Sequence, residues 1–289
     1  MSALTISICT NNSFSYLRKC LISLVKQTNK EFNLIIQDNY SNNLNKKKVK
    51  EVLGEILDYK YIYKQCSGLS ESRNICIKNC ETEYIHFLDD DVFCPNNFVD
   101  NLKVFLSENK PVCVGGKVLP DWGGIVKPDW LTNNCLPFLS IVDFGYTNLV
   151  DPPFLAGANL CFKLEVLKDL GGFSQNLGRI QDKNCLLSGE ETKVISLLKE
   201  QGLNHFYCPS FPVFHAMKKD RLTKKWLIKR AAWQAVSDFI SNNYEAYEFK
   251  NESIKNHIYR IFSANSSNMD EVLFSVRIIV YKLLFGLYE

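Results

Sequence analysis

The 289-residue sequence lacks any run of 18 apolar residues, so no transmembrane helix is predicted. The nearest approach, residues 272–288, is interrupted by Arg277 and Lys282. The N-terminus has no basic region followed by an apolar stretch and a cleavage site, so no signal peptide is predicted. A marked charge excess is missing too: 34 basic and 31 acidic residues give a net charge of +3, which does not indicate nucleic-acid binding. These absences predict a cytoplasmic protein without a nucleic-acid partner.

Paired metal-binding cysteines are also missing, although cysteine itself is abundant. None of the eleven cysteines stands in a Cys-x-x-Cys pair, which argues against a zinc site. An odd number spread evenly through a chain of this length argues against a disulfide framework. We therefore expect buried, reduced thiols. Apolar residues at 46% and charged residues at 22% are typical of a soluble globular protein.

Strand and helix patterns alternate through the first 90 residues. Short apolar, β-branched runs predict strands, and apolar residues at helical spacing predict helices between them. The expected strands cover 4–9, 32–37, 59–63 and 84–88, and the expected helices cover 14–25, about 45–57 and 70–79. Alternating elements with short connections predict an α/β fold with a parallel sheet and helices on both faces.

Polar side chains follow three of these expected strands. Thr10, Asp38 and the run Asp89–Asp91 each stand at the carboxyl end of a strand, and Ser13 can cap the first helix. Ligands of such sheets bind beyond the carboxyl ends of the strands. We therefore expect a binding site at this edge.

The second half of the chain has a different pattern. Pro, Gly and Trp accumulate over 119–153, and a long irregular segment in a compact domain is usually functional or mobile. An ordered segment over 154–162 and a helix over about 190–202 follow. After His215 the chain is expected to be helical to its end. The basic stretch 218–230 predicts contact with phosphate or an anionic membrane, or else a solvated helix face.

Two groups of adjacent carboxylates carry the strongest chemical signals. Asp89, Asp90 and Asp91 repel one another unless a cation neutralises them. Mg²⁺ typically binds one or two carboxylates together with substrate phosphates, whereas capping of the next helix explains only one carboxylate. Glu190 and Glu191 begin a helix, where a carboxylate pair either supplies a general base or simply complements the helix dipole.

Two single residues add weaker signals. Arg73 lies near a helix start, where backbone donors and the helix dipole favour anions, so it is a candidate contact for a diphosphate. A solvated helix arginine is the alternative. His215 ends a short apolar segment, and it is either a metal ligand or a buried structural histidine.

The order in which these signals occur is specific. The matching stretches are 5–10, 16–28, 32–39, 72–74, 84–91, Gly157–Asn159, Gly171–Phe173 and Gly189–Thr192. In these stretches, over residues 3 to about 220, the chain resembles the family 2 glycosyltransferases. The resemblance implies the GT-A fold, a Rossmann-like α/β architecture with a mostly parallel central sheet flanked by helices. That domain would cover 1–220, with a helical C-terminal extension over 221–289.

The resemblance also implies which residues bind a nucleotide-sugar. They would be Thr10, Asp38, Arg73, Asp89 and Asp90, with Asp38 facing the nucleobase. The family's usual proline before Thr10 is a cysteine here, and its usual Asp-Gly-Ser is Asn-Tyr-Ser at 39–41, which places a bulky side chain beside the nucleobase pocket.

Metal and catalytic roles follow from the same resemblance. Asp91 would bind a divalent metal, Mn²⁺ or Mg²⁺, with Asp89 and His215 as the further candidate ligands. Glu191 stands where the family usually has an aspartate as catalytic base, so the base is either Glu191 or Glu190.

The acceptor side is defined less sharply. Trp122 and Trp130 are candidates for stacking on sugar rings, or else belong to the core. The Gln-x-x-Arg-Trp element of processive members is absent, which favours addition of a single sugar.

The expected function is therefore inverting transfer of one sugar from a nucleotide-sugar donor, UDP-linked in the favoured case, to a hydroxyl of a glycan or lipid-linked acceptor in cell-surface polysaccharide synthesis. Sugar nucleotidyl transfer and an inactive sugar-nucleotide-binding homologue are the alternatives. Peripheral contact with the inner face of the membrane and a homodimer through the C-terminal helices are further expectations.

Overall fold

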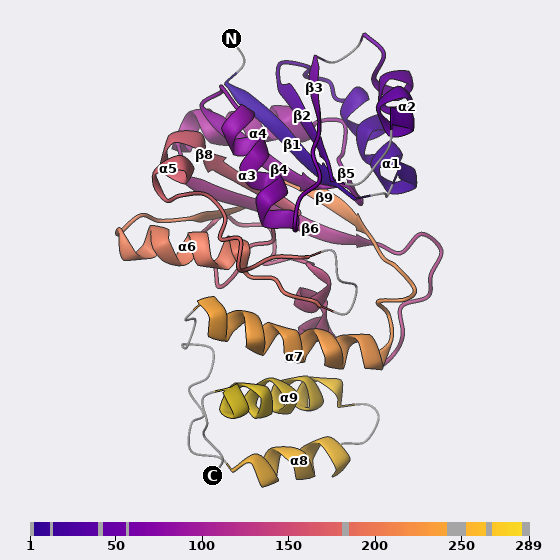
Figure 1. The fold of residues 1–289 in the computed structure, drawn as a ribbon, viewed down its shortest axis with the longest axis vertical. Coiled ribbons are helices and arrows are strands. Elements are labelled where there is room, and N and C mark those ends of the chain that lie inside the picture. Colours follow the sequence, from indigo (N-terminus) through magenta and orange to yellow (C-terminus); the bar gives the residue numbers. More distant parts are fainter. Residues whose placement is uncertain are drawn as a thin grey trace.

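The computed structural model describes residues 3–11, 14–39, 43–55, 58–180, 185–241, 253–263 and 268–284. Within these residues, one nine-stranded sheet with helices on both sides forms the upper body of the molecule, and three helices form the lower end (Figure 1). The expected cap Ser13 and the positions Tyr40 and Ser41 lie outside the described residues.

The first half of the sheet is parallel, as predicted. Its strands lie in the order β3 (Tyr59–Tyr63), β2 (Asn33–Asp38), β1 (Leu4–Thr10) and β4 (Tyr84–Asp89). The register pairs Thr10 with Asp38 and Cys9 with Asp89, so the polar strand ends meet at one edge. This shared edge is the feature that creates the site.

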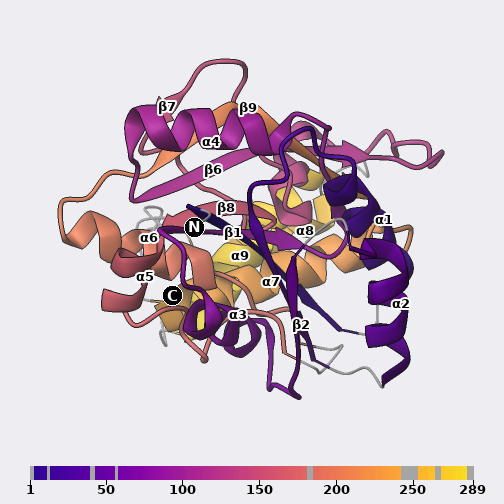
Figure 2. The same cartoon turned by 90° about the horizontal axis from the view of Figure 1, so that it is seen from above.

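The connecting helices match the sequence periodicity. They are α1 (Phe14–Val25), α2 (Asn43–Leu53) and α3 (Leu69–Asn79). Helices α1 and α2 lie together on one side of the sheet, and α3 lies on the other (Figure 2). Leu17, Leu21 and Leu24 of α1 are buried, as their helical spacing predicts.

Antiparallel pairing extends the sheet beyond β4. Strand β8 (Asn159–Lys163) runs antiparallel to β4 and to β6 (Cys113–Asp121), and β6 pairs in parallel with β9 (Phe206–Ala216). The short strands β5 (Val92–Phe93) and β7 (Leu149–Val150) both pair with β9. The sheet is thus mixed, with its parallel half on the side of β1.

The segment 119–153, expected to be irregular, contains more structure than its composition indicates. The end of β6, a 3₁₀ helix η1 (Asn133–Leu139) and β7 all fall in it. Pairing with β9 and contact with the C-terminal helices order these residues, and both partners come from later in the chain. Long-range pairing of this kind leaves no local sequence pattern.

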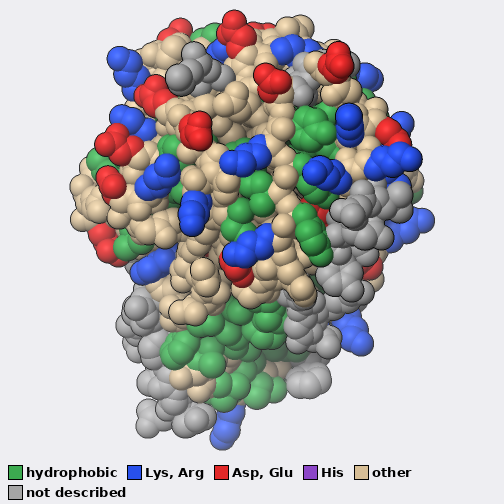
Figure 3. Space-filling view, turned by 45° about the horizontal axis from the view of Figure 1, so that its top comes forward, with side chains coloured by type: hydrophobic (Ala, Val, Ile, Leu, Met, Phe, Trp, Pro, Cys, Tyr) green, Lys and Arg blue, Asp and Glu red, His purple; other side chains and the backbone are tan. Residues whose placement is uncertain are grey.

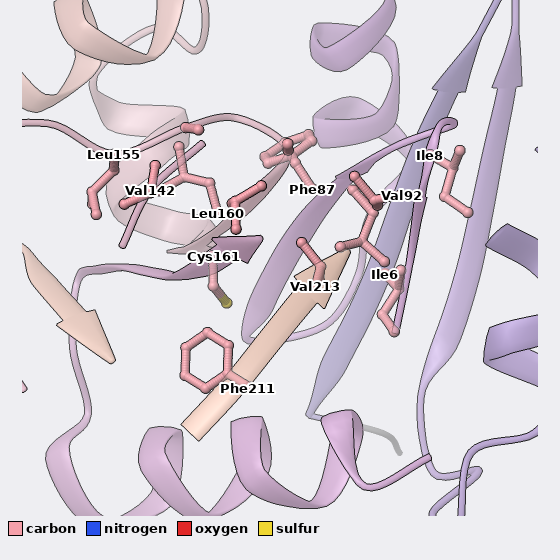
Figure 4. Packing of buried hydrophobic residues seen from close by; sticks show 14 of the residues in the cluster. Ile6, Ile8, Phe87, Val92, Val142, Leu155, Leu160, Cys161, Phe211 and Val213 are labelled. Atoms are coloured by element: carbon pink, nitrogen blue, oxygen red, sulfur yellow. The ribbon is translucent and has the colours of Figure 1, made fainter. Parts of the chain in front are cut away.

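Buried residues from both halves of the sheet form one core, part of which is visible in Figure 4. Ile6 and Ile8 of β1, Leu160 of β8, and Phe211 and Val213 of β9 all belong to this core. Further helices cover this core: α4 (Phe98–Asn109), α5 (Leu164–Asp169) and α6 (Glu190–Glu200). All eleven cysteines are free, and ten of them are buried, so the predicted state of the thiols is confirmed.

Three helices follow the last strand: α7 (Lys224–Ser241), α8 (Ile254–Ser263) and α9 (Met269–Leu284). Helix α7 lies directly below the sheet, α9 packs on α7, and α8 packs on α9 (Figure 1). Leu227 and Ala231 of α7 and Leu273 of α9 belong to the same core as the sheet. The helices on either side of the predicted boundary at 220 therefore share one core with the sheet.

Apolar side chains gather at the lower end of the molecule (Figure 3), where Figure 1 places α8 and α9. Ile258, Tyr259 and Leu283 are exposed hydrophobic residues of these two helices. Among the described residues, no helix has the length and apolar character needed to cross a membrane.

Candidate active site

A cavity of about 670 Å³ lies at the carboxyl ends of β1 and β4 and reaches α7. Its wall combines residues from the strand ends, from the start of α6 and from the C-terminal helices. The charged and polar side chains that line it include Thr10, Asn39, Arg73, Asp89, Asp90, Asp91, Arg179, Glu190, Glu191, His215, Lys218, Arg221, Arg230 and Arg277. The aspartate run 89–91 and the glutamate pair 190–191 therefore share one cavity.

The three aspartates after β4 have three different partners. Asp89 accepts from the Nη2 of Arg73 at 3.2 Å, and Asp90 accepts from the hydroxyl of Thr10 at 2.6 Å. Asp91 Oδ2 lies 2.6 Å from the Nζ of Lys218. Each carboxylate is thus held by a separate donor, which limits their mutual repulsion.

The aspartates differ in charge because their surroundings differ. Burial, together with the charge of Asp91, raises the pKa of Asp90 to about 7. Burial also acts to raise the pKa of Asp91, but His215 and Lys218 hold that pKa well below its usual range. Asp91 is therefore the carboxylate that stays anionic at all physiological pH values.

The ring of His215 is oriented by the backbone. Its Nδ1 lies 3.1 Å from the carbonyl oxygen of Leu139, which can only accept, so Nδ1 carries the hydrogen. Its Nε2 faces Asp91 Oδ1 at 3.2 Å. The ring is thereby held with Nε2 toward Asp91, and Nε2 is the nitrogen through which a histidine oriented in this way would ligate a metal.

Asp91 and His215 fit a divalent ion whose remaining ligands come from a bound substrate. The part of the chain that the structure describes contains no group of three or more His, Cys, Asp or Glu side chains that could hold a metal alone. Asp91 and His215 lie together, but Asp89 is turned to Arg73, so the predicted set of three ligands is not assembled. Mg²⁺-type sites commonly use one or two protein ligands and complete the shell with substrate phosphates and water.

Arg73 joins the two carboxylate groups. Its side chain is 3% exposed, and its guanidinium contacts Asp89 on one side and Glu190 Oε1, at 2.8 Å, on the other. Gly157 leaves the necessary space, because a Cβ there would lie 2.4 Å from Arg73 Nη2. Burial acts to lower the pKa of Arg73, but Glu190 and Asp89 raise it, so the guanidinium stays charged.

The glutamate pair begins α6, directly after Gly189, whose φ of +85° suits a glycine at the N-cap. Glu190 is 4% exposed and is committed to Arg73. Glu191 lines the cavity half-buried, and its Oε2 has no hydrogen-bond partner among the described residues. Burial and the charge of Glu190 raise the pKa of Glu191 to about 8. Glu191 is thus able to take up a proton near neutral pH.

Three residues expected at the site are not on its wall. Asp38 is fully buried at the end of β2 and accepts a hydrogen bond from the hydroxyl of Tyr61, whereas the next residue, Asn39, lines the cavity. Successive strand residues point to opposite faces, which separates these neighbours. Trp122 and Trp130 pack against the core instead, so the structure places neither on the wall of this cavity.

Several wall residues were not identified individually from the sequence. Aromatic rings of Phe138 and Phe154 line the cavity where the tryptophans were expected. Within the basic stretch 218–230, Lys218, Arg221 and Arg230 line the cavity, and Arg179 joins them from another segment. The charge of the stretch was visible in the sequence, but the division between cavity and surface depends on how α7 packs.

The mixed sheet, its flanking helices and the cavity with its aspartates at the strand ends define the GT-A class of fold. The sequence profile of "Glycosyl transferase family 2" matches residues 5–166. The chain belongs to this family.

A curated glucosyl-dolichyl phosphate glucuronosyltransferase of Haloferax volcanii is 28% identical over 173 residues, which cover 59% of this chain and 54% of that protein. The chain thus spans about half the length of this relative. A mannosyltransferase of Pyrobaculum calidifontis, solved with GDP-Man and Mn²⁺, aligns over 96% of this chain and 69% of that chain with a TM-score of 0.59 and 14% identity. GalNAc-T7, solved with UDP, GalNAc and Mn²⁺, aligns over 100% and 55% with a TM-score of 0.60 and 14% identity. These two structures share the fold with this chain.

Proposed function

We propose that this protein is an inverting glycosyltransferase that moves one sugar from a nucleotide-sugar to a hydroxyl of its acceptor. The observation that carries the proposal is the double ion pair of Arg73, which contacts Asp89 of the aspartate run and Glu190 of the glutamate pair. The guanidinium of Arg73 lies between the aspartate run and the glutamate pair. A leaving group bound to metal at the aspartates and a general base at the glutamates therefore fit in the same cavity.

The donor side of the proposal rests on the aspartate run. Asp91 and His215 would hold a divalent cation, which supplies positive charge to the leaving diphosphate of the donor. Lys218 and Arg221 line the same part of the wall and add fixed positive charge. Thr10 and Asn39, at the ends of β1 and β2, are the wall residues that we assign to the nucleoside.

The acceptor side of the proposal rests on Glu191. Its carboxylate would remove the proton from the acceptor hydroxyl, whose oxygen attacks the anomeric carbon while the bond from that carbon to the diphosphate oxygen breaks. Attack from the face opposite the leaving group inverts the anomeric configuration. Glu190 is paired with Arg73, and its charge, together with burial, raises the pKa of Glu191. General-base catalysis of this kind contributes roughly 10²–10⁴-fold.

The names of the relatives support the proposed substrate classes. One is named for an acceptor with a dolichyl phosphate, and a teichoic acid poly(glycerol phosphate) polymerase of Staphylococcus epidermidis is 34% identical over 93 residues, or 32% of this chain and 13% of that protein. We propose a glycan or lipid-linked acceptor in cell-surface synthesis, with a UDP-sugar as the favoured donor. The exposed apolar residues of α8 and α9 would then rest on the membrane that carries the acceptor, or would join two copies of the chain.

A donor panel with product identification tests the proposal. The protein is incubated with individual nucleotide-sugars and Mn²⁺ at a limiting concentration, and the release of nucleoside diphosphate is measured. Asp91→Asn is the matched variant, whose weaker metal binding leaves it without activity at that concentration. Release by the wild-type protein alone supports transferase chemistry, and an inverted anomeric carbon in the product, read by NMR, supports the mechanism. Formation of pyrophosphate would indicate nucleotidyl transfer instead, and nucleotide binding without turnover would indicate an inactive homologue.

A further inference from the structure

Two arginines of the cavity have hydrogen-bonding capacity that the protein does not use. Arg230 of α7 is only 7% exposed, and its Nε and Nη1 are buried without a hydrogen-bond partner among the described residues. The Nη1 of Arg179 is likewise buried without a hydrogen-bond partner among the described residues. Both side chains line the cavity. Buried donors without partners are costly, so a ligand that accepts from them is expected to bind there.

Two side-chain contacts hold Arg230 in place. Its Nη2 donates to the hydroxyl of Ser188 at 2.8 Å and to Oε1 of Gln234 at 2.8 Å. Gln234 in turn donates to Asp238 at 2.8 Å, and Asp238 also pairs with Arg277 at 3.1 Å. One edge of the guanidinium is thus fixed, while the Nε and Nη1 donors are left for another acceptor.

The positive charge at this end of the cavity is only partly compensated by the protein, because Asp238, which also acts on Arg230, is itself paired with Arg277. Burial and the charge of Arg230 lower the pKa of Arg179 to about 9, and burial lowers that of Arg230 to about 10. The carboxylates that act on both arginines are Glu190 and Glu191, and Glu190 is already paired with Arg73. The half-buried Arg179 and the buried Arg230 line the same cavity, and two such cations favour a divalent anion.

The location separates this pair from the donor diphosphate. Glu190 and Glu191 are among the carboxylates that act on both Arg179 and Arg230, whereas Asp89, Asp90 and Asp91 are held by Arg73, Thr10 and Lys218. Ser188, which holds Arg230, stands two residues before Glu190. The pair therefore lies on the acceptor side of the cavity.

We propose that Arg179 and Arg230 form a subsite for a phosphate group of the acceptor, so that the hydroxyl activated by Glu191 belongs to a phosphate-bearing molecule. This inference rests on the proposed function. A phosphate offers several acceptor oxygens and a charge of about −1 to −2, which matches two guanidinium groups better than the single charge of a carboxylate does. Arginine is suited to such contacts because its planar fork binds phosphate in two-point geometry.

Binding of small phosphates tests the subsite without knowledge of the acceptor. Three anions, namely methyl phosphate, dimethyl phosphate and acetate, are titrated by calorimetry in the absence of divalent metal. The titrations compare the wild-type protein with the variants Arg230→Gln and Arg179→Gln. Lys225→Gln is the matched control, because Lys225 is an exposed cation of the same helix outside the cavity wall. We expect methyl phosphate to bind the wild type and the control equally and each arginine variant about 10- to 100-fold more weakly, since hydrogen bonds to charged groups contribute about 1.5–3 kcal/mol. Stronger binding of the monoester indicates a terminal phosphate, and equal binding of the diester indicates a phosphodiester.

Donor hydrolysis separates this test from the test of the proposed function. We expect the KM for hydrolysis of the nucleotide-sugar to be unchanged in both arginine variants, because the donor does not use the subsite. Unchanged methyl phosphate affinity in the variants, or tighter binding of acetate than of methyl phosphate, would overturn the inference while leaving the transferase assignment intact. A raised donor KM would instead assign the pair to the donor diphosphate. Ser188→Ala removes a contact of Arg230 but no charge. A loss of methyl phosphate affinity in this variant as large as that in Arg230→Gln would show that Ser188 acts by positioning Arg230.

Discussion

Replacement of Glu191 by glutamine is the sharpest test of the catalytic geometry. The change removes one proton-accepting oxygen and preserves the size of a side chain that lines the cavity. Glu190, Arg73 and Asp89 keep their ion pairs, because none of those contacts involves Glu191. The variant therefore isolates the loss of the base from any loss of structure.

The expected magnitude follows from general-base catalysis. We expect kcat for sugar transfer to fall about 10²–10⁴-fold, or about 2.7–5.5 kcal/mol of transition-state stabilisation, with little change in the donor KM. In the wild type, the pKa of about 8 predicts that kcat/KM rises with pH up to about 8 and then levels, because the base must be ionised. The variant should lose this rise.

Stability should change in the opposite direction. The folded protein holds a proton on Glu191 more tightly than the unfolded chain does, since the unfolded pKa of a glutamate is about 4.3. Wild-type stability contributed by this group is therefore present below about pH 4.3 and is lost as pH rises toward about 8, by up to about 1.4 kcal/mol per pH unit. Glutamine carries no charge, so the variant does not lose stability in this way. The free energy of unfolding of Glu191→Gln minus that of the wild type should therefore be larger at pH 8 than at pH 5.

The assay measures transfer from pH 5.5 to 9 and thermal unfolding at pH 5 and pH 8. Glu165→Gln is the matched control, because Glu165 stands in the first turn of another helix, is exposed and lies outside the cavity. Full activity of Glu191→Gln would refute the assignment of the base. A large loss in Glu190→Gln with little loss in Glu191→Gln would assign the base to Glu190.

Three further predictions concern the groups around this base. Arg73→Met should destabilise the protein by about 3–5 kcal/mol in urea unfolding, because it leaves Asp89 and the buried Glu190 without their cation; an unchanged midpoint would show that the bridge is not structural. Removal of divalent ions with EDTA should abolish donor turnover and added Mn²⁺ should restore it, while Asp91→Asn should raise the Mn²⁺ concentration required by at least about tenfold; activity that resists EDTA would exclude the metal. Gly157→Ala should cost about 1–3 kcal/mol and lower kcat, because its Cβ would displace the Arg73 guanidinium; wild-type kinetics would show that the guanidinium can move without loss.

Local patterns were enough to predict the parallel half of the sheet. Strands β1 to β4 are short apolar runs, and α1 and α3 have regular apolar spacing, so each element is encoded within a few neighbouring residues. The full length of β9 was not predicted, because Pro209 and Pro212 interrupt its apolar pattern and its pairing partners lie in distant parts of the chain. The edge of the sheet that carries the aspartates followed directly from the predicted strand ends.

The candidate site was predicted in part for the same reason. Thr10, Arg73 and the carboxylates at 89–91 and 190–191 lie on the cavity as expected, since they stand at strand and helix ends that the fold brings together. Asp38 was expected on the wall and is buried, because one residue of offset at the end of a strand reverses the direction of the side chain.

The sequence alone determined the fold family, the order of the first strands and the two carboxylate groups, because these depend on short-range patterns of apolar and acidic residues. Only the tertiary structure decided how those carboxylates are paired. Arg73 reaches both groups because α3 packs beside β1 and Gly157 leaves space for its guanidinium. In the same way, only the packing of α7 below the sheet places Arg230 in the cavity, since contacts between residues far apart in the chain leave no periodic signal in either segment.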